Sequence, residues 1–425
     1  MPAPSDGPAS LSPARIRFAL LALALGGFGI GSTEFVAMGL LPNLAQDLLS
    51  GLYATSPDAA NAQAGWLITA YALGVVVGAP TIAAAAARWP RKQLLLALLA
   101  AFTLSTVASA LLPTFGLVLV ARFVAALPHG AYFGIASLVA ADLMGPGKRA
   151  RGVALVLGGL TIANVVGVPS ITWLGQTSGW RVAYLVVAAI FAVTFVAVAA
   201  LVPLQDGNPR ATMRSELRAF GRVQVWFALG IGAIGFGGLF AVYTYVAPLV
   251  MDVTGLGAGA VPLVLVVIGV GMTIGNFVGG AMADRSVRRS MYGFFGVMLL
   301  ALTGLALSAE SVPGLLIGVF FVGAAASALS PTIQTRLMDV SHDSQSIAAA
   351  LNHSALNVGN ALGAFLGGLA SAGGLGYVAP VWIGLGLSVL GLLLTVGTFL
   401  VDRIRRGNGV ELPYGTAAIR VVGAE

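Results

Sequence analysis

Few residues of this chain could do chemistry, and the first of them lies inside a long apolar run. Glu34 belongs to the run 17–42, and a helix needs about 20 apolar residues to span a bilayer. An ionisable side chain at the centre of such a helix costs about 2.5–3.5 kcal/mol on insertion scales, and it is tolerated where it faces a cavity or a partner. Glu34 is therefore the first candidate for a functional site.

Two further candidates lie in the run 115–142. Arg122 follows Thr114 by eight residues, just as Glu34 precedes Pro42 by eight. At 1.5 Å per residue, both charges are expected about 12 Å below the same membrane boundary. His129 lies seven residues beyond Arg122, which is about two helical turns along nearly the same face.

These three side chains suit the binding and release of a proton. Burial opposes the charged form of Glu34 and a nearby Arg122 favours it, so a small change of surroundings can switch its protonation. We hypothesise that Glu34 binds a coupling proton, that Arg122 tunes it, and that His129 assists or contacts substrate. Two plainer interpretations stay open: a permanent Glu34–Arg122 ion pair that locks two helices, and a hydrogen-bonded packing role for His129.

The second half of the chain offers neutral groups instead of a matching carboxylate. When Phe28-Gly29 is aligned with Phe236-Gly237, Val242 falls opposite Glu34. Aromatic rings with a few amides suit an amphipathic organic solute, although packing and hydrogen bonds between helices explain the same residues. The expected substrate cavity is lined by Phe236, Phe240, Tyr243, Gln334, His353, Asn357 and Asn360.

Several other chemistries lack the residues they need. The chain has no cysteine, which excludes a disulfide framework and a cysteine-based metal or redox site. Its three histidines show no HExxH-type spacing, and no GxxxxGK[ST] loop is present. We therefore expect no catalytic residues, no metal, no cofactor and no direct use of ATP.

The elements that must position these residues are membrane helices. Of the 425 residues, 58% are hydrophobic and only 9% are charged, whereas soluble domains carry about 25% charged residues. The apolar runs are continuous and do not alternate, which predicts helices and no barrel. The expected fold class is an all-α membrane protein with twelve spans, at 17–42, 65–87, 93–112, 115–142, 152–175, 182–203, 223–250, 260–283, 291–309, 314–335, 347–371 and 378–401.

Charge alternates between the connections. Arginine and lysine precede the first span, follow the last, and fill the second, fourth, sixth and eighth connections. The other connections carry Asp47, Asp58, Asp252 and Glu310, with Arg181 as an exception. The positive-inside rule then places both termini in the cytoplasm. It also explains the net charge of +7 by topology, without a nucleic-acid partner.

A polar, arginine-rich segment divides the chain into two halves. The basic connection at Arg88 recurs at Arg285, 197 residues later. Two six-helix repeats with a substrate path between them are typical of transporters. The expected organisation is a cytoplasmic tail 1–16, a bundle 17–203, a cytoplasmic linker 204–222, a second bundle 223–401 and a cytoplasmic tail 402–425.

One loop motif resembles a known family. Residues 280–289, GAMADRSVRR, resemble the GxLaDRxGRR loop of the major facilitator superfamily, and residues 83–92, AAAAARWPRK, form a degenerate first copy. Alanine replaces both the glycine and the aspartate in that copy. The resemblance implies a cytoplasmic gating loop formed by Arg88, Arg91, Gly280, Asp284, Arg285 and Arg288.

Four helix segments narrow the resemblance. GSTEFVAMGLLP (31–42), YALGVVVGAP (71–80), RFVAALPHGAYFG (122–134) and ANVVGVP (163–169) resemble the AraJ-type branch of the drug–proton antiporters. Gly167-Val-Pro169 is a looser form of that family's helix 5 antiporter signature. The resemblance implies two pseudo-symmetric six-helix bundles in which helices 1 and 4 line the cavity. We therefore expect Glu34 and Arg122 to communicate there, directly or through water.

The combined hypothesis is a secondary transporter of the bacterial inner membrane. It would export a small organic solute or drug in exchange for protons, by alternating access, as a monomer that uses neither ATP nor nucleic acid. One alternative keeps the fold: a sugar or nucleoside symporter or uniporter. The other is a membrane sensor without transport. A membrane-embedded enzyme lacks a polar catalytic cluster in this sequence.

Overall fold

The computed structural model describes residues 12–85, 89–145, 149–205, 222–341 and 345–407. The described chain is helical, and strands are absent from these ranges. Twelve of its helical segments are long and apolar enough to cross a membrane. The twelve spans expected from the apolar runs are therefore present. The linker core 206–221 and the tail from 408 lie outside the described residues.

The first six spans contain several interrupted helices. They comprise α1 (Pro13–Gly39), α2 (Leu41–Leu48), α3 (Ser50–Thr55), α4 (Pro57–Ala64), α5 (Trp66–Ala85), α6 (Arg91–Leu111), α7 (Phe115–Ala126), α8 (His129–Met144), α9 (Arg149–Ile162), η1 (Ala163–Gly167), α10 (Val168–Ser178) and α11 (Trp180–Leu201). The fourth span is divided at Pro128 and the fifth widens into the π-helix η1 just before Pro169. Proline lacks an N–H and crowds the preceding turn, which accounts for both interruptions.

The last six spans include one irregular helix. They comprise α13 (Val223–Gly230), η3 (Ile231–Gly235), α14 (Gly237–Thr244), α15 (Val246–Pro248), η4 (Leu249–Val253), η5 (Ala258–Ala260), α16 (Val261–Arg285), α17 (Val287–Ser308), α18 (Val312–Ser341), α19 (Gln345–Ala372) and α20 (Ala379–Gly407). The seventh span, from α13 to α15, changes between α and π geometry at its glycines.

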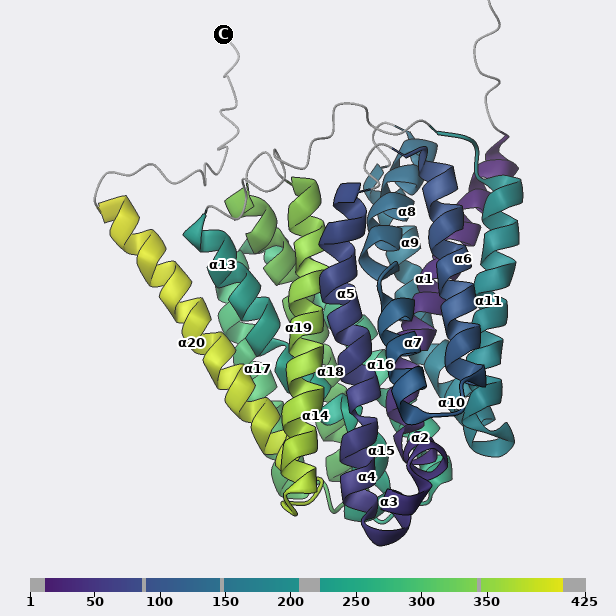
Figure 1. The fold of residues 1–425 in the computed structure, drawn as a ribbon. Helices are drawn as coiled ribbons and strands as arrows, with labels where there is room; N and C mark the ends of the chain where they lie inside the picture. The colour runs from purple at the N-terminus through teal and green to yellow at the C-terminus, as the bar shows by residue number, and fades with distance from the viewer. Residues whose placement is uncertain (1–11, 86–88, 146–148, 206–221, 342–344, 408–425) are drawn as a thin grey trace, which may run out of the picture.

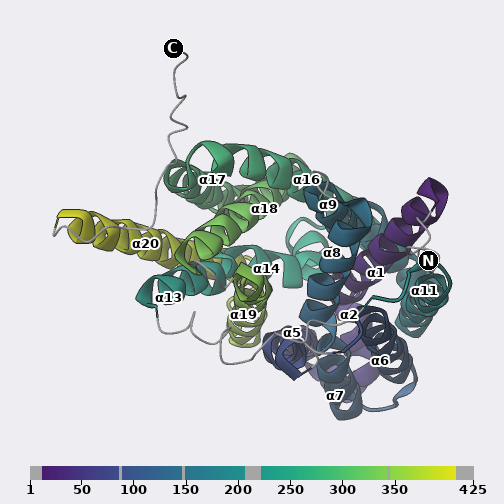
Figure 2. The ribbon, with the colours of Figure 1, turned by 90° about the horizontal axis from the view of Figure 1, so that it is seen from above.

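The helices gather into two bundles that meet along one boundary. Helices α1 to α11 lie on one side and α13 to α20 on the other, with α5 beside α19 and α9 beside α16 at the boundary (Figures 1 and 2). A glycine allows one close approach across it, because a Cβ at Gly269 would lie 2.4 Å from the carbonyl oxygen of Asn164. The start of α1 and the end of α20 lie at the same end of the molecule (Figure 1).

The outer faces suit lipid. Leu104, Phe277 and Leu300 are 71%, 72% and 76% exposed, and large exposed apolar side chains on this scale mark a non-aqueous surface. The core runs across the bundle boundary, with Phe35 of the first bundle and Phe240 of the second in one buried cluster.

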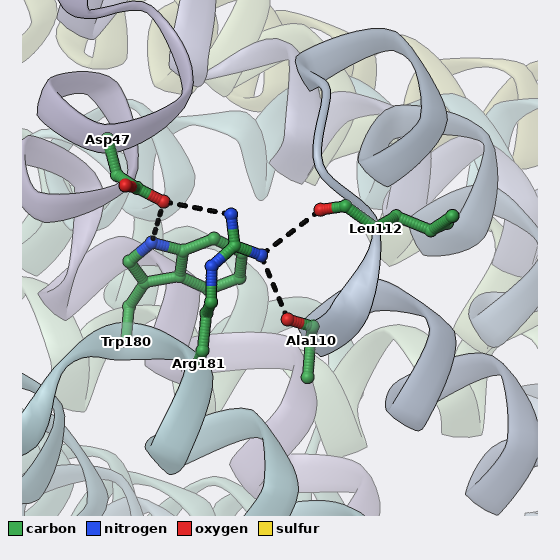
Figure 3. Close-up of polar contacts among 5 residues, drawn as sticks. All are labelled: Asp47, Ala110, Leu112, Trp180 and Arg181. Atoms are coloured by element: carbon green, nitrogen blue, oxygen red, sulfur yellow. Dashed lines mark hydrogen bonds and ion pairs between the residues drawn. The ribbon is translucent and has the colours of Figure 1, made fainter.

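Arg181, the cation that broke the charge alternation, has a structural role. Its guanidinium Nη1 donates to the carbonyls of Ala110 at 2.9 Å and Leu112 at 3.1 Å, and its Nη2 donates to Asp47 at 3.0 Å (Figure 3). The indole Nε1 of Trp180 donates to the same carboxylate at 2.9 Å. A cation stabilises the negative end of a helix, so Arg181 fastens the start of α11 to the end of α6.

Candidate functional site

The predicted proton-coupling residues lie at the boundary between the bundles. Glu34 on α1, Arg122 on α7 and His129 on α8 are 5%, 1% and 2% exposed. Asn360 on α19, from the other bundle, is fully buried beside them. Three ionisable side chains therefore share a buried region where the two bundles would have to separate.

Arg122 is held against α1 through the residue that precedes Glu34. Its Nη1 donates to the Thr33 carbonyl at 2.9 Å and to the Thr33 hydroxyl at 3.2 Å. The guanidinium lies 4.3 Å from the ring centre of Tyr71 and 5.5 Å from that of Tyr184. Nε and Nη2 are buried without a hydrogen-bond partner. The arginine thus keeps donors to spare inside the protein.

Glu34 is bound to the other bundle and not to Arg122. Its Oε1 accepts a hydrogen bond of 3.4 Å from the Nδ2 of Asn360. The Arg122 charge acts on Glu34, but these two described side chains form no ion pair within 4.0 Å. The locked ion pair considered above is therefore not the arrangement seen here. A role of this electrostatic interaction in proton coupling remains a prediction.

His129 has a partner in its own bundle and neighbours in the other. Its Nδ1 lies 3.3 Å from the Tyr71 hydroxyl, within hydrogen-bonding distance. Its ring centre lies 6.2 Å from that of His353, which stacks on Phe133 at 5.5 Å. The hydrogen bond fits the packing interpretation, and the contact with His353 fits a position on the transport path. Both interpretations stay open.

Two of the three aromatic residues expected in a substrate cavity, Phe240 and Tyr243, stack on Phe35 of α1. Phe35 stacks on Tyr243 at 5.1 Å and on Phe240 at 6.2 Å between ring centres, and Phe236 lies 5.6 Å from Phe240. The Tyr243 hydroxyl is buried without a hydrogen-bond partner. In this conformation the rings close the boundary on one another.

The two remaining residues of the expected cavity differ in burial. Asn357 donates from Nδ2 to the His353 carbonyl of its own helix at 3.0 Å, and its Oδ1 is buried without a partner. Gln334 is half-buried on α18. The free amide oxygen makes Asn357 the better candidate for a group that binds a solute.

The glycine of the Gly167-Val-Pro169 motif lies where the fifth span closely approaches α1. A Cβ at Gly167 would lie 2.7 Å from the Phe28 ring and 2.9 Å from the Ser32 hydroxyl of α1. Pro169 is the second residue of α10, in the first turn after the π-helix. The motif therefore controls the spacing of the helix that carries Glu34.

The gating-loop residues are only partly described. Arg91 forms an ion pair with Asp142 at the end of α8, so α8 supplies a carboxylate to a loop copy that has lost its own aspartate. Arg88 and the side chain of Asp284 lie outside the described residues. Gly280 has open space around it, Arg285 is exposed, and exposed Arg288 lies 6.0 Å from the Tyr292 ring centre.

A cavity of about 380 Å³ lies away from this region, within the second bundle. Arg336, buried in its wall, donates to Asp402 at 2.8 Å, Thr398 at 3.0 Å and Gln224 at 3.2 Å. The cavity is lined by Val287, Arg288, Arg336, Asp339, Phe399, Asp402 and Arg403. Its polar wall thus includes an internal ion pair of this bundle. Among the described residues, no group of three His, Cys, Asp or Glu side chains is placed to hold a metal ion.

Sequence reasoning missed several residues of the central region. Thr33 and Tyr71 hold Arg122, Tyr184 packs on it, and Phe35 and Phe133 form the stacks across the boundary. One signal was available for Thr33, Phe35, Tyr71 and Phe133, because all four fall within the segments that carried the family resemblance. Nothing in the local pattern indicated Tyr184.

Comparison with known proteins agrees with this architecture. The sequence model of the Major Facilitator Superfamily matches residues 23–311 and 255–421. The fold resembles the crystal structure of a D-xylose–proton symporter with a TM-score of 0.72, at 19% identity, over 89% of this chain and 97% of the other.

Curated relatives extend over most of the chain. It is 39% identical to the inner membrane transport protein YdhP of Escherichia coli K12, over 89% of this chain and 95% of the relative. It is 32% identical to a chloramphenicol resistance protein of Streptomyces lividans, over 89% of this chain and 95% of that relative. It is 31% identical to the putative transporter AraJ of Escherichia coli K12, over 93% of this chain and 97% of that relative. The AraJ-type resemblance is thus confirmed, and the chain is a multi-pass inner membrane protein and a secondary transporter that belongs to the Major Facilitator Superfamily.

Proposed function

We propose that this transporter exports a small organic solute in exchange for protons, with Glu34 as the proton-binding group. The observation that carries the proposal is the position of Glu34: a carboxylate buried at the bundle boundary, hydrogen-bonded to the opposite bundle and without an ion pair among the described residues. A group of this kind changes its contacts when it gains or loses a proton. Such a change is what coupling to bundle movement requires.

The solute would bind among aromatic and amide groups of the same boundary. Phe35, Phe240 and Tyr243 offer flat apolar surfaces, and the free polar atoms of Tyr243 and Asn357 offer hydrogen bonds. This combination suits an amphipathic organic molecule. The relative named for chloramphenicol resistance supports export as the direction.

Other parts of the proposal follow from charge placement and from missing motifs. Both termini would lie in the cytoplasm, where the basic connections gather. The proton gradient would supply the energy for transport, without ATP or an enzymatic step. The protein would bind no nucleic acid, and one chain would form the whole transport path. The two bundles would alternate in exposing the boundary to either side.

The test uses the purified protein in lipid vesicles with an internal pH dye and a panel of amphipathic organic compounds. Wild type is expected to move protons in the direction opposite to the solute, and Glu34→Gln is expected to lose this exchange. Glu310→Gln makes the same chemical change at an exposed carboxylate and should exchange protons like wild type. Undiminished exchange in Glu34→Gln would contradict the proposal. Solute and protons moving together would establish a symporter of the same fold instead.

A further inference from the structure

The two bundles are joined at the end of the molecule that charge placement predicts to face outward, called the outer end below. Among the described residues, the hydrogen bonds that cross the boundary include Asn61 to Tyr377 at 2.8 Å, Gln176 to the Ala258 carbonyl at 3.0 Å, and Asn360 to Glu34 at 3.4 Å. Helix α4, which carries Asn61, lies at the end of the molecule opposite the start of α1 and the end of α20 (Figure 1). The contact between Glu34 and Asn360 therefore belongs to a conformation closed at that end.

Only one side of the Asn360 amide group is hydrogen-bonded. Its Nδ2 donates to Glu34, but its Oδ1 is fully buried and has no partner. An ionised carboxylate only accepts hydrogen bonds and cannot satisfy that oxygen. A protonated Glu34 has an O–H to donate. The carboxylic acid and the amide could then form a two-point pair, with one hydrogen bond in each direction.

Arg122 has the opposite deficit: it lacks hydrogen-bond acceptors, whereas Asn360 lacks a donor. Two of its donors, Nε and Nη2, are buried without a partner, and its charge acts on Glu34. An ionised Glu34 would satisfy these donors, since a guanidinium fork matches a carboxylate well. The other titratable groups that interact with Glu34 are the phenols Tyr71 on α5 and Tyr243 on α14. Neither phenol brings a positive charge that could compete with Arg122.

We propose that Glu34 has two alternative partners, and that Asn360 is the positioning residue that converts its protonation into closure of the outer end. When Glu34 is protonated, it donates to the Asn360 Oδ1, accepts from the Nδ2, and ties α1 to α19. When Glu34 loses the proton, the carboxylate turns to Arg122 within its own bundle and frees α19. Protonation thus closes the outer end and deprotonation releases it. The inference rests on the proposed proton coupling by Glu34.

The absence of cysteine in the chain makes a distance measurement straightforward. Thr55→Cys and Leu375→Cys place spin labels at exposed sites of the two bundles, near the joined end. Distances are measured by pulsed electron resonance in lipid nanodiscs between pH 5 and pH 9. The labelled parent is expected to shift towards the short distance as the pH falls, with a definable midpoint.

Substitutions at the pair separate a switch from simple packing. Glu34→Gln cannot ionise and offers both a donor and an acceptor, so it should stay closed at every pH. Asn360→Leu should lose the pH dependence and favour the open distance. In Asn360→Asp two carboxyl groups would share one proton, which such pairs hold more tightly. The closure midpoint should then rise by about one pH unit or more.

Asn352→Leu removes another buried asparagine from the same helix and should leave the midpoint in place. A purely structural Asn360 would weaken closure equally at every pH and leave the midpoint of Asn360→Asp at the parent value. That result would overturn the inference, and it stays readable if Asn360→Leu does not fold. Failure of the proposed function looks different, because pH-dependent closure would persist in a protein whose transport moves no protons.

Discussion

Asn61 of the first bundle donates a hydrogen bond of 2.8 Å to the hydroxyl of Tyr377 of the second, across 316 residues of sequence. A net hydrogen bond is worth about 1 kcal/mol, and 1.4 kcal/mol is tenfold in an equilibrium. Tyr377→Phe removes this bond together with the hydrogen bond of the same hydroxyl to Asp58. It should therefore shift the closed outer end towards the open state by at least about fivefold. The spin-label distance at fixed pH measures the shift. Tyr53→Phe, at a half-buried tyrosine of α3, serves as the control. An unchanged distance distribution in Tyr377→Phe would show that this bond does not hold the end closed.

Asp252 gives the same end of the molecule a pH dependence of its own. Burial, and then the nearby charge of Asp58, raise the pKa of Asp252 above its usual value of 3.8. A carboxyl whose pKa is raised on folding stabilises the folded state at low pH and loses that contribution as the pH rises through the raised pKa. Wild type is expected to lose melting temperature as the pH rises above about 4, and Asp252→Asn should flatten this fall. Because Asp252 is exposed, the effect should be small.

Thermal unfolding followed by tryptophan fluorescence between pH 4 and pH 8 measures this difference. Glu310→Gln removes an exposed carboxylate of another connection and should keep the wild-type slope. If Asp252→Asn made the melting temperature fall more steeply with pH, the predicted sign of the Asp252 contribution to stability would be wrong.

The helices were predictable from sequence because lipid demands long apolar runs, and Glu34 was predictable because a carboxylate is costly inside one. The sequence did not predict the irregular segments, and only the structure shows that the 163–167 segment is a π-helix. The composition of the chain is therefore enough to derive the class of fold.

The partners within the central region were less predictable. The hydrogen-bond partner of Glu34 is Asn360, 326 residues away. Periodicity identifies a buried face only where another face is polar, and α1 and α5 are apolar all round. The sequence placed Asn360 among solute-binding candidates, because an amide in an apolar helix indicates a polar neighbour without naming it.

Gly167→Ala tests the spacing between α1 and the fifth span, which runs from α9 to α10. A Cβ there would lie 2.7 Å from the Phe28 ring, and overpacking of this kind costs about 1–3 kcal/mol. Gly167→Ala should lower the melting temperature and slow transport. Gly158→Ala is the matched control, because a Cβ at Gly158 meets open space and alanine favours a helix by about 1 kcal/mol over glycine. Equal effects of the two substitutions would exclude a spacing role for the motif.

Arg122→Lys tests whether the central cation is needed as a guanidinium or only as a charge. Lysine keeps the charge but loses the planar contact with Tyr71 and the pair of hydrogen bonds from one Nη1 to Thr33. A hydrogen bond to a charged group contributes about 1.5–3 kcal/mol. The rate of solute-driven proton exchange should therefore fall at least about tenfold. Arg181→Lys changes the half-exposed arginine that binds helix-end carbonyls. The exchange rate of this control should fall much less. Wild-type exchange in Arg122→Lys would mean that a point charge is sufficient at this position, and that the orphan guanidinium donors take no part in coupling.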